Sequence, residues 1–194
     1  ERKENSHFLV VCPVSLLENW KREISKFYPS FTTYLHYGAR RTGDYRELLK
    51  YDITIMSYSS AIVDAGMLTM TNWDLLVIDE AQNIKNPRAK RTKAIKQINR
   101  DVPIAITGTP FENHMTDIWS IVDFVMPGFL GNLNQFEMFF EDDLDSAVRL
   151  EKLITPLILR RRVKDVAKDL PERVDIPQPI IMTDEEAMLY EDSR

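Results

Sequence analysis

The sequence predicts an α/β protein built on a parallel sheet with helices on both faces. Short aliphatic runs alternate with segments whose apolar residues recur at helical spacing, which is the pattern of successive βαβ units. The run from Leu75 to Ile78 is too short for a helix and too apolar for a half-exposed strand, so we expect it to be buried on both faces. With 44% hydrophobic and 28% charged residues among 194, the composition is that of a folded domain.

The expected elements each have a local signal. Phe8–Cys12 is an apolar strand, and Ser15 with Glu18 three residues later forms a capping box that should open the next helix. That helix has one apolar face, made of Leu16, Leu17, Trp20, Ile24 and Phe27. The elements expected after it are a strand near 32–36, a helix near 45–50, a strand at 53–56, the strand at 75–78, a helix at 88–98 begun by Pro87, a strand at 103–106 and a helix through 115–125.

Three parts are expected along the chain: a partial α/β lobe over 1–131, a helical insertion with a basic segment over 132–172, and the start of a linker over 173–194. The strand and helix rhythm breaks near Gly131 into helical, aromatic-rich and acidic sequence. The chain begins without methionine in polar residues, and Thr183 with Glu186 opens a last helix too short to bury a face. We therefore expect sequence on both sides of this segment.

The composition argues against several classes of protein. A single cysteine, Cys12, excludes a disulfide framework and is expected to be a small buried hydrophobe, so a reducing cytoplasm, or a nucleus in a eukaryote, is the expected location. No apolar run approaches the ~20 residues of a membrane helix.

The charge is unevenly distributed. A net charge of −5 argues mildly against a dedicated nucleic-acid binder. Seven basic residues nevertheless follow one another without an acid between them, namely Lys85, Arg88, Lys90, Arg91, Lys93, Lys96 and Arg100. They form either a solvated helix face or a contact to DNA phosphates, and the sequence leaves both readings open.

Asp79 and Glu80 directly follow the aliphatic run. The carboxyl end of a parallel strand is where open α/β sheets bind ligands. In phosphoryl transfer, one acid holds Mg²⁺, usually through water, and a second orients or deprotonates the attacking water. We assign Asp79 to the metal and Glu80 to the water, although these residues alone also fit an ordinary strand that ends in solvated acids.

A phosphate-binding loop is not found where its glycine spacing suggests one. Gly38 and Gly43 have the spacing of the G-x-x-x-x-G-K-[ST] loop, but Asp44 stands at its lysine position and Tyr45 at its magnesium-binding hydroxyl position. An acid there would repel phosphates. Either this protein hydrolyses nothing, or its phosphate loop lies before Glu1; the second interpretation is favoured.

A second polar turn follows the strand at 103–106. Thr107, Gly108, Thr109 and Pro110 end that strand, and threonine hydroxyls there could respond to a phosphate or to the acid pair. An ordinary capped turn is the alternative, which the presence of the acid pair makes less favourable.

Five runs together resemble the Swi/Snf family of helicase-like ATPases within superfamily two. They are Cys12 to Trp20, Ile55 to Tyr58, Asp79 to Asn86, Thr107 to Asn113, and Leu159 to Arg161 continuing through Leu170 and Pro171. The resemblance implies a RecA-like lobe that uses ATP and Mg²⁺ and moves along double-stranded DNA together with a second lobe. It also implies that the phosphate loop and the second lobe lie outside this chain, so that the isolated segment should be inactive.

The resemblance also implies roles for particular residues. Asp79 would bind Mg²⁺, Glu80 would be the catalytic base, and Gln82 would couple nucleotide state to motion. The residues implied in nucleotide sensing and coupling are Thr107, Gly108, Thr109 and Asn113. Those implied near the DNA backbone are Ser15, Asn19, Ser57, Tyr58, Arg160 and Arg161. Val163 occupies a position where the family usually has lysine, so a contact made through that lysine is not implied for this chain.

Two other interpretations remain. An RNA or single-strand helicase would need strand-separating elements and readers of the 2′-hydroxyl, which this sequence does not display. A non-enzymatic interaction module with an inert ATPase fold is disfavoured by the intact acid pair. Trp20 and Trp119, at helical spacing, are expected in the core and not as platforms for stacked bases.

Overall fold

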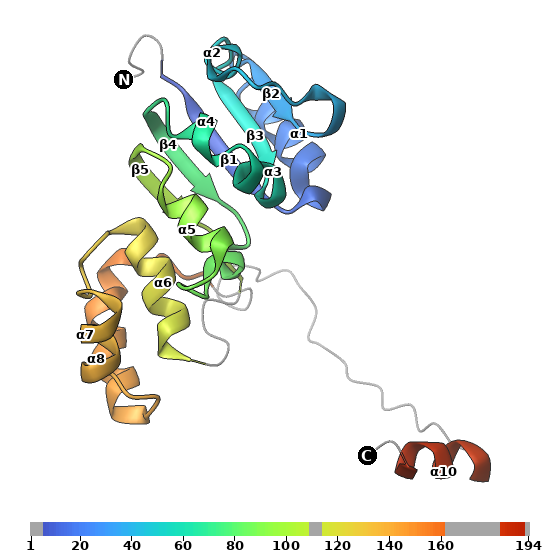
Figure 1. Cartoon of the computed structure of the whole chain (residues 1–194), viewed down its shortest axis with the longest axis vertical. Coiled ribbons are helices and arrows are strands. Elements are labelled where there is room, and N and C mark those ends of the chain that lie inside the picture. The colour runs from blue at the N-terminus through green and yellow to red at the C-terminus, as the bar shows by residue number, and fades with distance from the viewer. Residues whose placement is uncertain (1–5, 109–113, 162–182, 193–194) are drawn as a thin grey trace. The chain divides into compact units, whose positions relative to one another are not determined.

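The computed structural model of the chain describes residues 6–108, 114–161 and 183–192. The chain divides into two compact units, Glu1–Leu157 and Ile158–Arg194. The first unit contains a sheet and helices, and the described part of the second contains one helix, α10 (Asp184–Asp192) (Figure 1).

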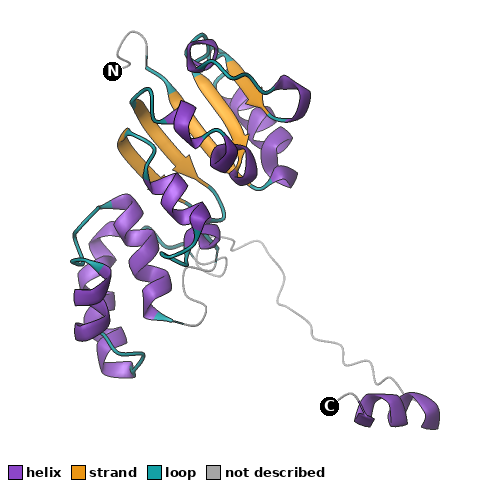
Figure 2. Cartoon of the chain, in the orientation of Figure 1, coloured by secondary structure: helices purple, strands orange, loops and turns teal. Residues whose placement is uncertain are grey.

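Five parallel strands form the sheet in the order β2-β3-β1-β4-β5 (Figure 2). They are β1 (Phe8–Cys12), β2 (Thr33–His36), β3 (Ile53–Ser57), β4 (Trp73–Ile78) and β5 (Arg100–Ala105). In the central strand, Val11 lies opposite Met56 on one side and Ile78 on the other. Because all five strands run in the same direction, the residues that follow them meet at one edge of the sheet.

Apolar side chains pack on both faces of the sheet, which confirms the sequence prediction. One face is covered by α1 (Leu17–Phe27), over a cluster that includes Val10 and Ile55. The other face packs against α2 (Tyr45–Leu48), α3 (Tyr58–Val63), α4 (Ala65–Leu68) and α5 (Lys90–Lys96).

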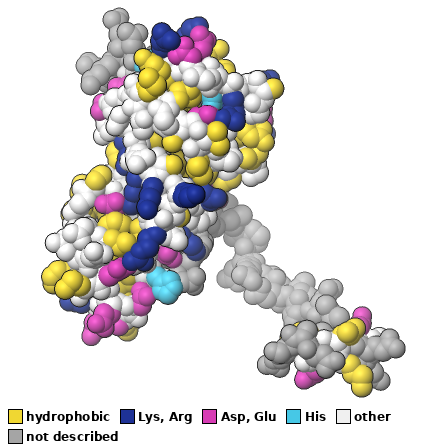
Figure 3. All heavy atoms as spheres, in the orientation of Figure 1, with side chains coloured by type: hydrophobic (Ala, Val, Ile, Leu, Met, Phe, Trp, Pro, Cys, Tyr) yellow, Lys and Arg dark blue, Asp and Glu magenta, His cyan; other side chains and the backbone are white. Residues whose placement is uncertain are grey.

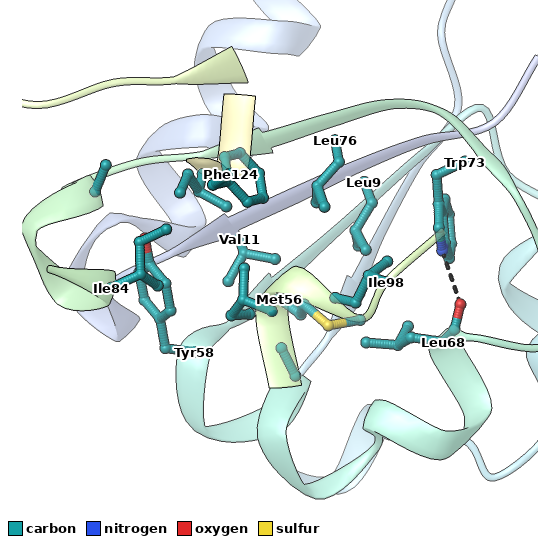
Figure 4. Packing of buried hydrophobic residues seen from close by; sticks show 14 of the residues in the cluster. Leu9, Val11, Met56, Tyr58, Leu68, Trp73, Leu76, Ile84, Ile98 and Phe124 are labelled. Atoms are coloured by element: carbon teal, nitrogen blue, oxygen red, sulfur yellow. Dashed lines mark hydrogen bonds between the residues drawn. The ribbon is translucent and has the colours of Figure 1, made fainter. Parts of the chain in front are cut away.

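The face of the sheet that α2 to α5 cover holds a buried apolar cluster. Leu9, Val11 and Met56 lie in it, and the indole of Trp73 donates to the carbonyl of Leu68 at 3.2 Å (Figure 4). A fully buried aliphatic or aromatic side chain contributes roughly 1.5–3 kcal/mol, so this packing fixes the strands that carry the polar turns.

Strand β5 ends the sheet and is the least covered strand. Val102, Ile104 and Ile106 are 52%, 42% and 42% exposed. Val102 and Ile104 pair with Leu75 and Val77, so this apolar stripe belongs to the face that α1 covers elsewhere.

Three helices follow the sheet: α6 (Met115–Val125), α7 (Leu133–Phe139) and α8 (Leu144–Ile154). They share a cluster in which Trp119 packs with Phe136 and Leu150, while Phe124 of α6 packs in the sheet cluster. Helix α6 therefore joins the helical part to the sheet within one compact unit. The predicted division of the chain at 131 stays a prediction, and the predicted boundary at 172 lies outside the described residues.

The predicted cap of the last helix is confirmed. Thr183 donates from its backbone nitrogen to Glu186 Oε2 at 2.9 Å, and Glu186 N donates to Thr183 Oγ1 at 3.4 Å. No described helix combines the length and apolar character needed to cross a membrane.

Two predicted helix starts are wrong. Ser15 does not cap α1, because a 3-10 turn, η1 (Val14–Leu16), comes first and Leu16 N donates to Pro13 O at 2.9 Å. Helix α5 begins at Lys90 and not after Pro87, because Asn86 accepts the Arg88 amide on its side chain at 2.9 Å and holds a turn there.

Candidate functional site

The acid pair lies at the carboxyl end of β4, where the backbone is unusual. Glu80 has φ 51° and ψ 55°, and it is the non-glycine residue with positive φ in the described part of the chain. A residue with a side chain in this region costs roughly 1–3 kcal/mol, and such residues concentrate at functional sites. Here the conformation is held by Asn83, whose backbone and side-chain nitrogens both donate to Glu80 O at 2.9 Å.

Asp79 is fixed by four hydrogen bonds. Its Oδ1 accepts from Glu80 N at 2.8 Å and its Oδ2 accepts from Trp20 Nε1 at 2.9 Å. Its backbone oxygen accepts from the hydroxyl of Tyr58 at 2.8 Å, and its backbone nitrogen donates to Val11 O at 2.8 Å. Helices α1 and α3, which pack on opposite faces of the sheet, therefore both contact this aspartate.

A chain of side-chain hydrogen bonds connects the acid pair to the threonine turn. Thr107 Oγ1 donates to Gln82 Oε1 at 2.9 Å, and Gln82 Nε2 donates to Glu80 Oε2 at 2.7 Å. The backbone adds a parallel link, because Ala81 N donates to Ile106 O at 2.9 Å. Two motifs that are 25 residues apart in sequence thus form one polar cluster, with Gln82 in η3 (Ala81–Ile84) between them.

The interior behind Asp79 is poorly solvated. Burial is the larger cause and the nearby Asp79 carboxylate the smaller, and together they raise the pKa of the Cys12 thiol to about 12. Burial, followed by the same carboxylate, also raises the pKa of Tyr58. Both groups stay protonated at neutral pH, so Cys12 is an inert core residue as predicted and Tyr58 remains a hydrogen-bond donor.

The residues predicted near DNA divide into two groups. Ser15 and Asn19 are exposed at the start of the first helical segment, where Asn19 Oδ1 accepts from Arg22 Nη2 at 2.6 Å. Ser57 and Tyr58 are 1% and 5% exposed. Ser57 Oγ caps α3 by accepting from Ser60 N, and Tyr58 belongs to the same buried cluster as Ile84 (Figure 4). Their side chains have interior roles, which argues against direct DNA contact by these two.

The other predicted site residues are placed only in part. Gly108 is exposed, and Arg160 and Arg161 are exposed in the second unit. Thr109 and Asn113 lie outside the described residues, as do Val163 and the run at 170–171.

The turn with phosphate-loop spacing has a structural role. Asp44 Oδ1 accepts from Arg46 N at 3.0 Å and caps α2, and Gly38 supplies a positive φ of 59° in η2 (Gly38–Arg40). Its interpretation as a false match is consistent with this geometry.

The basic stretch along α5 is only partly a free surface. Lys90, Arg91 and Lys93 are exposed, and Lys and Arg side chains gather over α5 on the face shown in Figure 3. Lys96 instead pairs with Asp123 at 2.7 Å, and Arg100 donates to three backbone carbonyls, those of Lys96, Ile98 and Phe124. The expectation of a uniformly solvated or DNA-facing run is therefore wrong for these two.

A parallel α/β sheet that unites an acid pair, a glutamine and a threonine turn at its carboxyl edge defines a helicase-like ATPase lobe. The chain belongs to the SNF2-related domain family, whose match extends over residues 1–194. The predicted Swi/Snf membership is thereby confirmed.

Relatives in bacteria and yeast support the same assignment. An uncharacterized ATP-dependent helicase of Mycoplasma genitalium, MG018, is 38% identical over 186 residues, which cover 94% of this chain and 18% of that protein. The chromatin-remodeling ATPase INO80 of Saccharomyces cerevisiae is 29% identical over 208 residues, covering 95% of this chain and 14% of that protein. The chain thus spans about a fifth or less of the length of such relatives.

Two solved structures from Sulfolobus solfataricus have the same fold. The SWI2/SNF2 ATPase core in complex with dsDNA matches with a TM-score of 0.76 and 37% identity, over 98% of this chain and 41% of that one. The SWI2/SNF2 ATPase core domain matches with a TM-score of 0.74 and 38% identity, over 97% and 40%. The predicted RecA-like α/β fold is confirmed.

Sequence reasoning missed one residue of this site. Trp20 was expected in the core from its helical spacing, and its ring does pack on the α1 face of the sheet. Its N–H, however, bonds to Asp79, a partner 59 residues away. Local periodicity carries no signal for such a pair.

Proposed function

We propose that this chain is the first ATPase lobe of a motor that hydrolyses ATP to move along double-stranded DNA. The observation that carries the proposal is the hydrogen-bonded chain from Glu80 through Gln82 to Thr107. It gives the acid pair a physical link to a second polar turn, which an ordinary strand ending in solvated acids would not need.

The proposed roles follow from these contacts. Glu80 accepts a proton from the attacking water through its carboxylate, which Gln82 Nε2 contacts at 2.7 Å. Gln82 holds Glu80 and Thr107 together, so a displacement of the threonine turn changes the position of the base. We assign Gly108, Thr109 and Asn113 to the same coupling turn.

The donor groups fit a magnesium nucleotide. In the described residues, no group of three His, Cys, Asp or Glu side chains could enclose a metal. Mg²⁺ does not need such a cage, because it keeps several waters and is bound by one or two carboxylates plus substrate phosphates. Asp79 would hold it through water, and the ion would neutralise charge on the phosphates.

The DNA contacts are proposed to be made to phosphates, because a motor that moves along arbitrary sequence cannot depend on base edges. Ser15 and Asn19 are exposed and can donate hydrogen bonds, and Arg160 and Arg161 supply positive charge. The dsDNA in the Sulfolobus complex supports this choice of nucleic acid.

The phosphate loop and the second lobe are proposed to be supplied by sequence outside residues 1–194. Val102 and Ile104 of β5, with Ile106 directly after the strand, form an exposed apolar stripe that a further element of this first lobe could cover. The second lobe would supply an arginine finger, and loss of that residue alone typically lowers the hydrolysis rate ~10³- to 10⁵-fold. The isolated segment should therefore not turn over ATP.

The substrate test uses the full-length protein. Its ATPase rate is measured without nucleic acid and with duplex DNA, single-stranded DNA or RNA. We expect duplex DNA to stimulate most. Stronger stimulation by RNA or by single strands would replace the proposal with a strand-separating helicase, and no ATP turnover under any condition would indicate an inert interaction module.

The test of the base is Glu80→Gln in the same protein. Hydrolysis should fall by at least ~10²–10⁴-fold, because the general base is lost, while ATP binding, measured with a fluorescent analogue, should be retained. A variant that still hydrolyses ATP at the wild-type rate would show that another residue is the base.

A further inference from the structure

Trp20 makes a contact that packing alone does not require. It is the fourth residue of α1, is half-buried, and packs with the cluster that contains Val10 and Cys12. A phenylalanine could fill most of that space. The indole N–H of Trp20 donates to Asp79 Oδ2 at 2.9 Å.

This bond fixes the orientation of the Asp79 carboxylate. The terminal torsion of an aspartate is broad and close to two-fold, so the carboxylate turns easily unless it is held. Oδ1 is held by the next amide in the chain, and Oδ2 is held by a side chain from α1. Each oxygen has a second lone pair, so both can still accept from water while their direction is fixed.

We infer that Trp20 is a positioning residue for Asp79, and that it ties the magnesium-binding carboxylate to helix α1. The inference rests on the proposed function. Partners that orient a metal-binding side chain typically change metal affinity or activity by about 10–100-fold when they are removed. Asn19, the exposed neighbour of Trp20 on α1, places the same helix next to a proposed DNA contact.

Trp20→Phe in the full-length protein removes the N–H and keeps an aromatic ring. The matched control is Trp119→Phe, because Trp119 Nε1 also donates one hydrogen bond, at 3.1 Å, to the carbonyl of Gly131 in the helical part. Three quantities are compared: the Mg²⁺ concentration that half-saturates ATPase activity, the affinity for a fluorescent ADP analogue with Mg²⁺ or with EDTA, and the melting temperature.

We expect Trp20→Phe to raise the half-saturating Mg²⁺ concentration by about 10-fold or more. The gain in ADP affinity on adding Mg²⁺ should shrink, while the affinity in EDTA stays within about twofold. Trp119→Phe should alter only the melting temperature. A Trp20→Phe protein with unchanged Mg²⁺ dependence, whatever its melting temperature, would overturn the inference.

A second measurement covers a Trp20→Phe variant that does not fold. 5-Fluorotryptophan is placed at position 20 of the otherwise wild-type full-length protein, and its fluorine resonance is followed as Mg²⁺ is added with ADP. The resonance should shift, whereas the same label at position 119 should not. No shift at position 20 would overturn the inference. Failure of the proposed function is separate, because it would appear as a wild-type protein without DNA-stimulated ATPase.

Discussion

Similar residues at the carboxyl ends of β4 and β2 have opposite roles. Each strand is followed by a polar turn, and each turn is contacted by an aspartate. At β2, Asp64 accepts from His36 Nε2 at 2.8 Å and from two nitrogens of Arg41, at 2.7 and 3.1 Å. At β4, Asp79 accepts from one amide and one indole, and no cation is among those donors.

The difference lies in what remains for a ligand. Arg41 neutralises Asp64, and His36 beneath it is fully buried, so that region is a closed structural cluster. The carboxylate of Asp79 accepts from two neutral donors and has spare lone pairs, and its neighbour Glu80 is linked to a second turn. Glycine spacing alone pointed to the β2 turn, but the contacts of the two aspartates favour the β4 end as the proposed nucleotide site.

The largest test of this comparison removes one acid from each region. Asp79→Ala should reduce ATPase activity of the full-length protein by more than ~100-fold, the upper range for a partner that merely orients a metal-binding group. Asp64→Ala should leave activity within about twofold. Steady-state ATPase assays with saturating duplex DNA measure both.

Asp64→Ala should lower the melting temperature although it leaves the activity nearly unchanged. It leaves buried His36 without its acceptor, which costs ~1–3 kcal/mol, and that lowers the melting temperature by roughly 2–4 °C per kcal/mol in a domain of this size. If Asp64→Ala lost activity as severely as Asp79→Ala, the two regions could not be assigned separate roles.

A smaller effect is expected from removing one hydroxyl in each region. Thr107→Val breaks the bond to Gln82 Oε1, so DNA-stimulated turnover should fall about tenfold, equivalent to ~1.4 kcal/mol. Thr42→Val, which removes an acceptor of the Asp44 amide at 3.2 Å, should change turnover less than twofold. Equal losses in the two variants would mean that the connection through Gln82 carries no coupling.

The sheet was predictable because its signals are local. Strand β1 is a continuous apolar run and β3 is apolar except at Thr54 and Ser57, and the predicted bounds differ from the observed ones by a residue at most. The predicted starts of β4 and β5 were two or three residues late, since Trp73 and Arg100 are not part of an aliphatic run.

The sequence predicted most residues of the candidate site, but not the contacts that hold them in place. The acid pair and Thr107 were identified by residue type and by their positions after strands, whereas Gln82 was identified by the resemblance to the Swi/Snf family. Parallel strands bring these strand ends together. The bond from Trp20 to Asp79 and the burial of Tyr58 depend on how α1 and α3 pack. Such contacts arise from the three-dimensional arrangement and leave no trace in local periodicity.

The smallest expected effect is a loss of stability at acid pH that comes from Asp64 and its contacts with Arg41 and His36. Burial raises the pKa of Asp64, but the hydrogen bonds from Arg41 and His36 outweigh it, so the net pKa lies below its ordinary value. A lowered folded-state pKa means that the stabilisation is complete above the unfolded-state value of ~3.9 and is lost as the pH falls further, through the folded-state value.

The wild-type melting temperature should therefore contain a component that declines as the pH drops below about 4, and Asp64→Asn should lack it because the amide does not titrate. Thermal unfolding followed by circular dichroism between pH 2.5 and 6 measures both proteins. An equally steep decline in Asp64→Asn would assign the acid sensitivity to other carboxylates. Asp64 would then stabilise the turn after β2 through hydrogen bonds from His36 and Arg41 that do not require its negative charge.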